Sequence, residues 1–236
     1  MHNESPCHHV PLTYNVHKSF TMFTYLIYTH LQRNGTTFRD GTFNSYTGET
    51  DYALLDRVHT FNNQTQTHFG GSCGDISGSA DGFFPSLTMD QPAKTVGHMP
   101  DSIDLYTHQA CRSMTYLKAD ESLPDYHGLQ HQEYQLDPRT FANGSEHKTN
   151  SCFENNLPSG VQNNSYCGGE NVPLYLSLPH FYQADGHYLR QFSNKSDLNP
   201  NKASHQSFMR LDPVMSTLTK FKFGLQLNVK IYTMPE

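Results

Sequence analysis

The sequence has no long hydrophobic run. A membrane-spanning helix needs about 18 consecutive apolar residues, and the most apolar stretch, 20–31, is interrupted by threonines, tyrosines and His30. The N-terminus also lacks the basic segment and apolar core of a secretory signal peptide. We therefore expect no bilayer-spanning helix within this chain, and any targeting information should lie outside it or be absent.

Positive charge is also sparse. The formal net charge is −6, and lysine and arginine are scattered along the chain rather than gathered in one stretch. A nucleic-acid partner requires a concentrated basic face. Nucleic acid is therefore not expected as a partner.

The common cofactor and metal motifs are missing. The glycine-rich segments contain no phosphate-binding loop, and no H-E-x-x-H or C-x-x-C pattern accompanies the fifteen histidines. The histidines that could be considered as ligands are His8, His9, His127, His131, His180 and His187. Without carboxylates or cysteines at matching spacing, these side chains predict neither a metal site nor a cofactor.

The composition that remains is typical of a polar, strand-rich globular protein. Only 35% of residues are hydrophobic and the mean hydropathy is −0.67, but aromatic residues make up 12% of the chain. A wholly disordered chain has few aromatics. At 236 residues the chain is long enough for one large domain or two small ones.

Two features favour an oxidising compartment. Six N-x-[ST] triplets are potential N-glycosylation sites, of which Asn3 is the least certain; the others are Asn34, Asn63, Asn143, Asn163 and Asn194. Four cysteines lie in the middle of the chain and Cys7 is left over; the four are Cys73, Cys111, Cys152 and Cys167. Four cysteines allow three disulfide connectivities. A cytosolic protein with free thiols remains the alternative to a secreted or lumenal one.

The periodicity of the sequence predicts short strands separated by long loops. Strand candidates are 110–118, 132–136 and 172–178, and turns are expected near 39–41, 46–48 and 62–63. Residues 70–82 and 143–169 should be loops. The clearest signal is 221–231, where apolar residues alternate with polar ones. Its apolar positions are Phe221, Phe223, Leu225, Leu227, Val229 and Ile231.

A serine hydrolase is a further alternative, because Gly70-Gly71-Ser72-Cys73-Gly74 fits the G-x-S-x-G pattern. A nucleophile elbow needs a hydrophobic strand before the serine and a helix after it. Here the preceding segment 63–68 is polar and 75–82 is rich in glycine, serine and aspartate. We expect no catalytic role for Ser72, and the chain is interpreted as a non-enzyme.

Several motifs occur in an order that resembles the class B scavenger receptor family. They are the stretch 73–85 (Cys-Gly-Asp-Ile-Ser-Gly-Ser-Ala-Asp-Gly-Phe-Phe-Pro), Cys111-Arg112-Ser113, the stretch 174–181 (Leu-Tyr-Leu-Ser-Leu-Pro-His-Phe), and 198–200 with His205 downstream. The Asp-Gly and Thr-Gly pairs at 40–48 and the stretch 225–228 are also similar to the family. The match runs from about 34 to 231. Gly224 departs from it, because the family usually has arginine there.

The resemblance implies a β-rich α+β fold, a barrel-like antiparallel ectodomain with short helices and long loops. Residues 25–236 would be the C-terminal half of that ectodomain and 1–24 an unassigned tail, so the barrel is expected to be incomplete and the chain alone to aggregate. It also implies the disulfides Cys73–Cys152 and Cys111–Cys167. Phe221, Phe223 and Leu225 would line either a dry core or the family's apolar tunnel.

The function that the resemblance implies is a membrane-anchored receptor that binds lipids or lipoproteins and passes fatty acids or sterols to the membrane. Its anchors would lie outside this chain, at the plasma membrane with the ectodomain extracellular, or at the lysosomal membrane with the ectodomain lumenal. A lysosomal protein-sorting receptor of the same family is the alternative. The serine hydrolase is a remote one.

Overall fold

The fold was established from a computed structural model. The structure describes residues 21–26, 41–47, 49, 51, 54, 57–80, 99–126, 129–153, 156–167, 173–192, 198–213 and 218–231. Within this part of the chain no helix is both long enough and apolar enough to cross a membrane.

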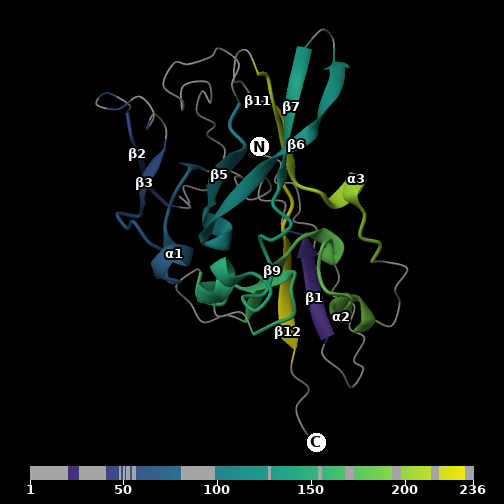
Figure 1. The fold of residues 1–236 in the computed structure, drawn as a ribbon. Helices are drawn as coiled ribbons and strands as arrows, with labels where there is room; N and C mark the ends of the chain where they lie inside the picture. The colour runs from purple at the N-terminus through teal and green to yellow at the C-terminus, as the bar shows by residue number, and fades with distance from the viewer. Residues whose placement is uncertain are drawn as a thin grey trace, which may run out of the picture.

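The described residues form three sheets and a few short helices (Figure 1). The six-stranded sheet has the order β11-β10-β7-β6-β5-β4, the four-stranded sheet the order β1-β12-β9-β8, and β2 and β3 form a hairpin. All strand pairs are antiparallel except β4 with β5. The sheets curl as an open, half-barrel-like wall, which confirms the β-rich fold with short helices and long loops.

The strands are β1 Thr21–Leu26, β2 Phe43–Ser45, β3 Val58–Phe61, β4 Ser79–Ala80, β5 Ser102–Thr107, β6 Arg112–Tyr126, β7 Leu129–Leu136, β8 Val161–Asn163, β9 Leu174–Ser177, β10 Phe208–Leu211, β11 Leu218–Lys222 and β12 Gln226–Ile231. The helices are α1 Gly71–Gly74, η3 His108–Ala110, η4 Lys148–Phe153, η5 Pro179–Phe181, α2 Gly186–Arg190 and α3 Lys202–His205.

The six-stranded sheet buries one face and leaves the other half-exposed. Alternate residues of β6, β7 and β10 form the inner face and are at most 1% exposed; they are Met114, Tyr116, Tyr134, Leu136, Met209 and Leu211. The register places Tyr134 beside Met209, so these side chains meet on the same face. The outer face carries polar groups, including the ion pair between Arg210 and Glu133 at 2.9 Å. This is the inside-apolar pattern that a period of two predicts.

The expected strand over 221–231 proves to be two strands in different sheets. β11 ends at Lys222 and pairs with β10, whereas β12 begins at Gln226 and lies between β1 and β9. Figure 1 shows them one after the other in yellow. The link 223–225 passes so close to η5 that a Cβ on Gly224 would lie 3.0 Å from Cγ of Pro179. Because the chain must change sheets here, alternation continues while strand pairing is interrupted.

The polar face of β12 is buried. Gln226 and Asn228 are both 0% exposed. The Gln226 side-chain amide donates to Oδ1 of Asn228 at 2.8 Å and its Oε1 accepts the His180 backbone N–H at 2.7 Å. The Asn228 amide donates to Oγ of Ser177 at 3.0 Å. Buried amides are tolerated when their hydrogen bonds are satisfied, so this network holds β12 against β9 and η5.

The other expected strands lie within observed ones, with shifted bounds. The segments 132–136 and 172–178 fall on β7 and β9, and 110–118 begins with part of η3 before entering β6. The expected loops contain short elements: α1 and β4 in 70–82, and η4 and β8 in 143–169. The strand β1 was not expected, and the proposed boundary between 24 and 25 falls inside it. Residues 1–20 lie outside the described residues.

Candidate functional site

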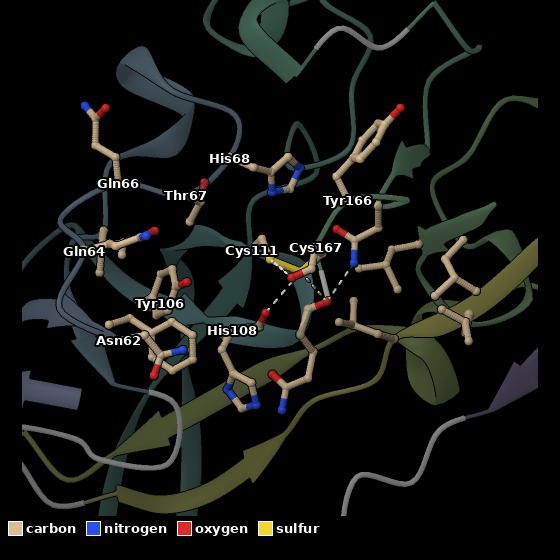
Figure 2. Close-up of a pocket in the computed structure, with 18 of the residues that line it drawn as sticks. Asn62, Gln64, Gln66, Thr67, His68, Tyr106, His108, Cys111, Tyr166 and Cys167 are labelled. Carbon is tan, nitrogen blue, oxygen red and sulfur yellow. Dashed lines mark hydrogen bonds between the residues drawn. A yellow bond between two sulfur atoms is a disulfide. The ribbon is translucent and has the colours of Figure 1, made fainter. Parts of the chain in front are cut away.

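A cavity of about 760 Å³ opens between the four-stranded sheet and the β3–α1 segment. Its floor is apolar and consists of Leu174, Leu176, Phe223, Leu225 and Leu227. Its upper wall carries polar side chains; they are Asn62, Gln64, Gln66, Thr67, His68, His108, Gln109, Asn164 and Tyr166. Figure 2 shows many of these polar residues around the disulfide between Cys111 and Cys167. The cavity therefore has one face for an apolar group and another for hydrogen bonds.

The floor is built by the pairing of β9 with β12. Leu227 lies opposite Leu176 in the register, so both side chains project from the same face. The other face of β12 carries the buried amides of Gln226 and Asn228. As a result Leu227 is only half-buried, although it is surrounded by fully buried polar neighbours. The apolar face of this sheet thus borders the cavity and also packs in the main hydrophobic core, which contains Leu176 and contacts Leu227.

The link between β11 and β12 extends this floor. Phe223 and Leu225 are half-buried, line the cavity and also pack against the main hydrophobic core. Phe221 packs on the same core, and its ring stacks on Phe223 with centroids 6.0 Å apart. Of the two roles that the resemblance implied, Phe223 and Leu225 thus combine core and cavity wall, whereas Phe221 belongs to the core.

The upper wall is supported by the β2–β3 hairpin and an aromatic cluster. Asn62 and Asn63 have φ of 51° and 62°, the left-handed conformation of a tight two-residue turn. The turn expected at this dipeptide is thus confirmed, and it is closed by reciprocal backbone hydrogen bonds between Phe61 and Gln64. The Phe61 ring packs on Tyr106 with centroids 5.6 Å apart, which fixes the hairpin above β5.

Two disulfides join distant parts of the chain. Cys111 is bonded to Cys167 beside the cavity, and Cys73 of α1 is bonded to Cys152 of η4. These are the two pairs that the family resemblance implies. Cys111 has φ of 50° and ends η3. The bridge to Cys167 therefore anchors the turn that carries part of the upper wall.

Arg112 is a buried structural clamp next to Cys111. Its guanidinium donates to the Thr140 carbonyl at 2.7 Å and to Oε1 of Gln162 at 3.0 Å, and it lies 3.8 Å from the ring centroid of Phe153. Burial lowers the pKa of Arg112 to about 9, although the nearby Asp137 carboxylate opposes this shift. The contacts connect β6 with η4 and β8, so this part of the motif stabilises the fold.

Ser113 completes the motif from the outer side. Its hydroxyl donates to the Ser77 carbonyl at 2.9 Å and accepts the Ser77 backbone N–H at 3.0 Å. This contact holds the segment between α1 and β4 against β6. The three motif residues thus form a disulfide, a buried cation site and a loop clamp, all adjacent to the cavity wall.

Ser72 lies in a setting that differs from a nucleophile elbow. It is exposed on the four-residue helix α1 and follows a turn at 68–69 rather than a strand. Its hydroxyl lies 3.6 Å from Sγ of Cys152, a sulfur of the disulfide. A serine nucleophile needs a neighbouring base, and the contact that the structure gives the Ser72 hydroxyl is with this sulfur instead.

The candidate histidines are dispersed. His131 contacts the Thr219 hydroxyl at 3.0 Å, His187 contacts the Gln191 amide at 2.7 Å, and His180 stacks on His205 with centroids 4.4 Å apart. Across the part of the chain that the structure describes, no three metal-ligating side chains come together. His8, His9 and His127 lie outside the described residues.

Three of the potential glycosylation sites can be located. Asn63 is exposed in its turn, Asn143 donates its side-chain amide to the Leu157 carbonyl at 2.5 Å, and the Asn163 side chain accepts the Ser165 N–H at 3.0 Å. Asn3, Asn34 and Asn194 lie outside the described residues. Glycosylation of these sites remains a prediction, which a gel-mobility shift on glycosidase digestion of secreted protein would test; exposed Asn63 should carry a glycan.

Comparison with known proteins finds one family model and several relatives. A model of the CD36 family matches residues 7–236. The chain is 31% identical over 210 residues to Protein peste of Drosophila melanogaster, covering 87% of this chain and 35% of that protein. It is 30% identical over 194 residues to Scavenger receptor class B member 1 of Sus scrofa, covering 81% and 35% respectively.

A third relative is Lysosome membrane protein 2 of Homo sapiens, which is 28% identical over 205 residues, covering 85% of this chain and 39% of that protein. The chain thus spans between 35% and 39% of the length of these relatives. The family match extends over nearly the whole chain and agrees with the motifs, the sheets and the two disulfides. The chain belongs to the CD36 family.

Proposed function

We propose that this chain forms part of a lipid receptor and that the cavity holds the apolar part of a lipid without changing it chemically. The observation that carries the proposal is the orientation of β12, which buries amides and turns Leu227 toward a cavity. An ordinary sheet buries its apolar face in a dry core. An apolar floor beside a large open cavity instead suits an alkyl chain or a ring system.

The driving force for such binding is the burial of apolar surface, about 25 cal/mol per Å². The half-buried floor residues Leu174, Phe223, Leu225 and Leu227 offer that surface, whereas Leu176 is only 4% exposed. Capture and release by this means need no nucleophile, metal or cofactor. The proposed activity is therefore binding and passive transfer.

The relatives support the setting of this activity. One is named a scavenger receptor and another a lysosome membrane protein. By extension we place this chain on the extracellular or lumenal side of a membrane, with lipids or lipoproteins as its partners. The two disulfides suit both locations, because a protein of either location passes through the oxidising secretory pathway, in which disulfides form.

A polarity change in the floor tests the proposal. The chain is secreted from a eukaryotic host and its monomeric fraction is isolated by size-exclusion chromatography, because aggregation of the chain alone is expected. This fraction is titrated with an environment-sensitive fluorescent acyl probe, and Leu225→Gln is compared with Leu117→Gln. Both leucines are half-buried, but Leu117 lies opposite Gln135 on the outer face of the six-stranded sheet.

We expect saturable binding to the wild-type chain, a loss of about tenfold in affinity for Leu225→Gln, and an unchanged affinity for Leu117→Gln. Absence of saturable binding, or equal losses in both variants, would contradict the proposed function.

A further inference from the structure

The described residues that line the cavity are polar or apolar but carry no acidic or strongly basic group. Among the described residues that line it, none is lysine, arginine, aspartate or glutamate. Its polar members are amides, hydroxyls and two histidines. Of these, His68 has a pKa lowered by partial burial, so its imidazole favours the neutral form at physiological pH.

The absence of a cation matters for the lipid head group. A carboxylate that leaves water for a cavity loses hydration that neutral donors replace less well than a positive charge does. A neutral hydroxyl loses far less, and each of the wall amides can donate to it or accept from it. The wall therefore favours an uncharged polar head group over a carboxylate.

Two oxygen atoms without a hydrogen-bond partner also favour an uncharged head group. The Thr67 hydroxyl oxygen and Oε1 of Gln109 are shielded from solvent and have no hydrogen-bond partner in the described structure. Both residues line the cavity. The Gln109 oxygen can only accept, so it favours a ligand that donates a hydrogen bond, which a hydroxyl does and a carboxylate does not. The Thr67 hydroxyl can donate or accept, so a neutral hydroxyl can pair with it in either direction.

The mouth of the cavity is also suited to a neutral amphiphile. Tyr166 is 55% exposed at the rim, and its ring lies 6.3 Å from that of His68. Figure 2 shows Tyr166 and His68 on one side of the Cys111–Cys167 bridge. An exposed aromatic ring with a polar tip offers an apolar contact and a hydrogen bond to the same ligand.

We propose that this cavity selects lipids with a neutral hydroxyl head group, such as a long-chain alcohol or a sterol, over fatty-acid anions. The selectivity rests on the proposed function of the same cavity, but it is a separate property. The apolar floor determines whether a lipid binds, and the uncharged wall determines which head group it carries.

The test compares two ligands with the same alkyl chain. Dodecanol and laurate compete with the fluorescent acyl probe at about pH 7.5, where laurate is an anion and histidine is mostly uncharged. We expect dodecanol to displace the probe at about tenfold lower concentration than laurate. Equal or tighter binding of laurate would overturn the selectivity and leave the proposed function intact. Failure of both ligands to displace a bound probe, or absence of probe binding, would refute the proposed function itself.

A cation introduced into the wall sharpens the test. Gln64 is exposed and lines the cavity, so Gln64→Lys adds a counter-ion with little effect on packing. The preference for dodecanol should fall to about twofold or less. The matched variant Gln135→Lys, on the outer face of the six-stranded sheet beside Phe208, should keep the wild-type preference. A preference that survives Gln64→Lys in folded protein would contradict the role of the uncharged wall.

Discussion

The two large sheets of this molecule have the same alternating sequence pattern but place their polar faces differently. In the six-stranded sheet, apolar residues such as Tyr134 and Met209 are 0% exposed and the polar residues face outward. In β12 of the four-stranded sheet, Gln226 and Asn228 are 0% exposed while Leu227 lines the cavity. A period of two therefore determines which residues share a face but leaves open which face is inside.

The difference arises from what each sheet packs against. The inner face of the six-stranded sheet belongs to a core that also contains Leu176 and Leu178, and Leu176 borders the cavity as well. The buried face of β12 meets backbone and amide groups of β9 and η5, which satisfy its hydrogen bonds. One sheet gains its stability from apolar burial, and the other combines hydrogen bonding with an apolar surface that remains available to a ligand.

The largest expected effect concerns the bond between these two regions. Cys111 immediately precedes β6 and Cys167 follows β8, with a sequence separation of 56. The loop-entropy relation assigns such a bridge about 4 kcal/mol of stability. The double variant Cys111→Ser, Cys167→Ser should unfold at lower urea concentration, with the four-stranded sheet opening first.

Hydrogen exchange read by mass spectrometry would show the order of opening. Peptide mapping without reduction gives an independent check of the bridge. A peptide in which Cys73 is joined to Cys111 would contradict the pairing on which this prediction depends.

A pair of leucine truncations would compare the two apolar faces directly. Leu136 is 1% exposed in the dry core, and Leu227 is half-buried at the cavity. Leu136→Ala should cost about 2–5 kcal/mol of unfolding free energy, as buried leucine truncations do. Leu227→Ala should cost less than half as much, because its side chain already borders open space. Equal losses in urea titrations would mean that the β12 leucine belongs to an ordinary core.

A substitution of a buried amide by an apolar side chain would test the polar face of β12. Asn228→Leu removes the partner of both the Gln226 amide and the Ser177 hydroxyl, and unsatisfied buried polar groups cost about 1–3 kcal/mol. The substitution makes the segment more hydrophobic and yet should destabilise it. Asn44→Leu, an exposed amide that contacts Thr60 at 2.8 Å, should change the stability by less than about 0.5 kcal/mol. Thermal unfolding that ranks the two variants the other way would refute the buried network.

The smallest expected effect is a pH dependence where the two sheets meet. His205 of α3 precedes β10, and its ring stacks on His180 of η5, which follows β9. Burial, His180 and Lys222 lower the pKa of His205, so the folded state favours the neutral ring. Its contribution is complete above the unfolded pKa of about 6.5 and is lost as the pH falls through the lower folded value.

Because His205 is partly exposed, the loss should stay below about 1 kcal/mol. The midpoint of thermal unfolding should therefore fall slightly more between pH about 7 and about 5 in the wild-type chain than in His205→Gln. Glutamine keeps an acceptor for the Asn201 backbone N–H, which Nδ1 of His205 accepts at 3.0 Å. Identical pH profiles would exclude His205 as the titrating group.

Parts of the fold and of the site follow directly from the residues. Alternation located β7, β9 and β12, although it predicted one strand where β11 and β12 are separate, and the Asn62-Asn63 dipeptide located a turn. The family motifs led to the correct family and to the disulfide pairs that the structure contains. The sequence did not predict that Arg112 is a buried clamp, since a single arginine in a sequence carries no sign of burial. The signal that the sequence offered was its place between a cysteine and a serine of the family motif.

The sequence by itself determined which residues of a strand share a face, where the turn at 62–63 falls and to which family the chain belongs. Only the tertiary structure decided that the link 223–225 changes sheets, that Gln226 and Asn228 lie inside, and that Leu227 faces a cavity beside an uncharged wall. The physical reason is that periodicity is a local property of the chain, whereas the inside and outside of a sheet depend on partners such as Ser177 and His180 that lie about fifty residues away in sequence.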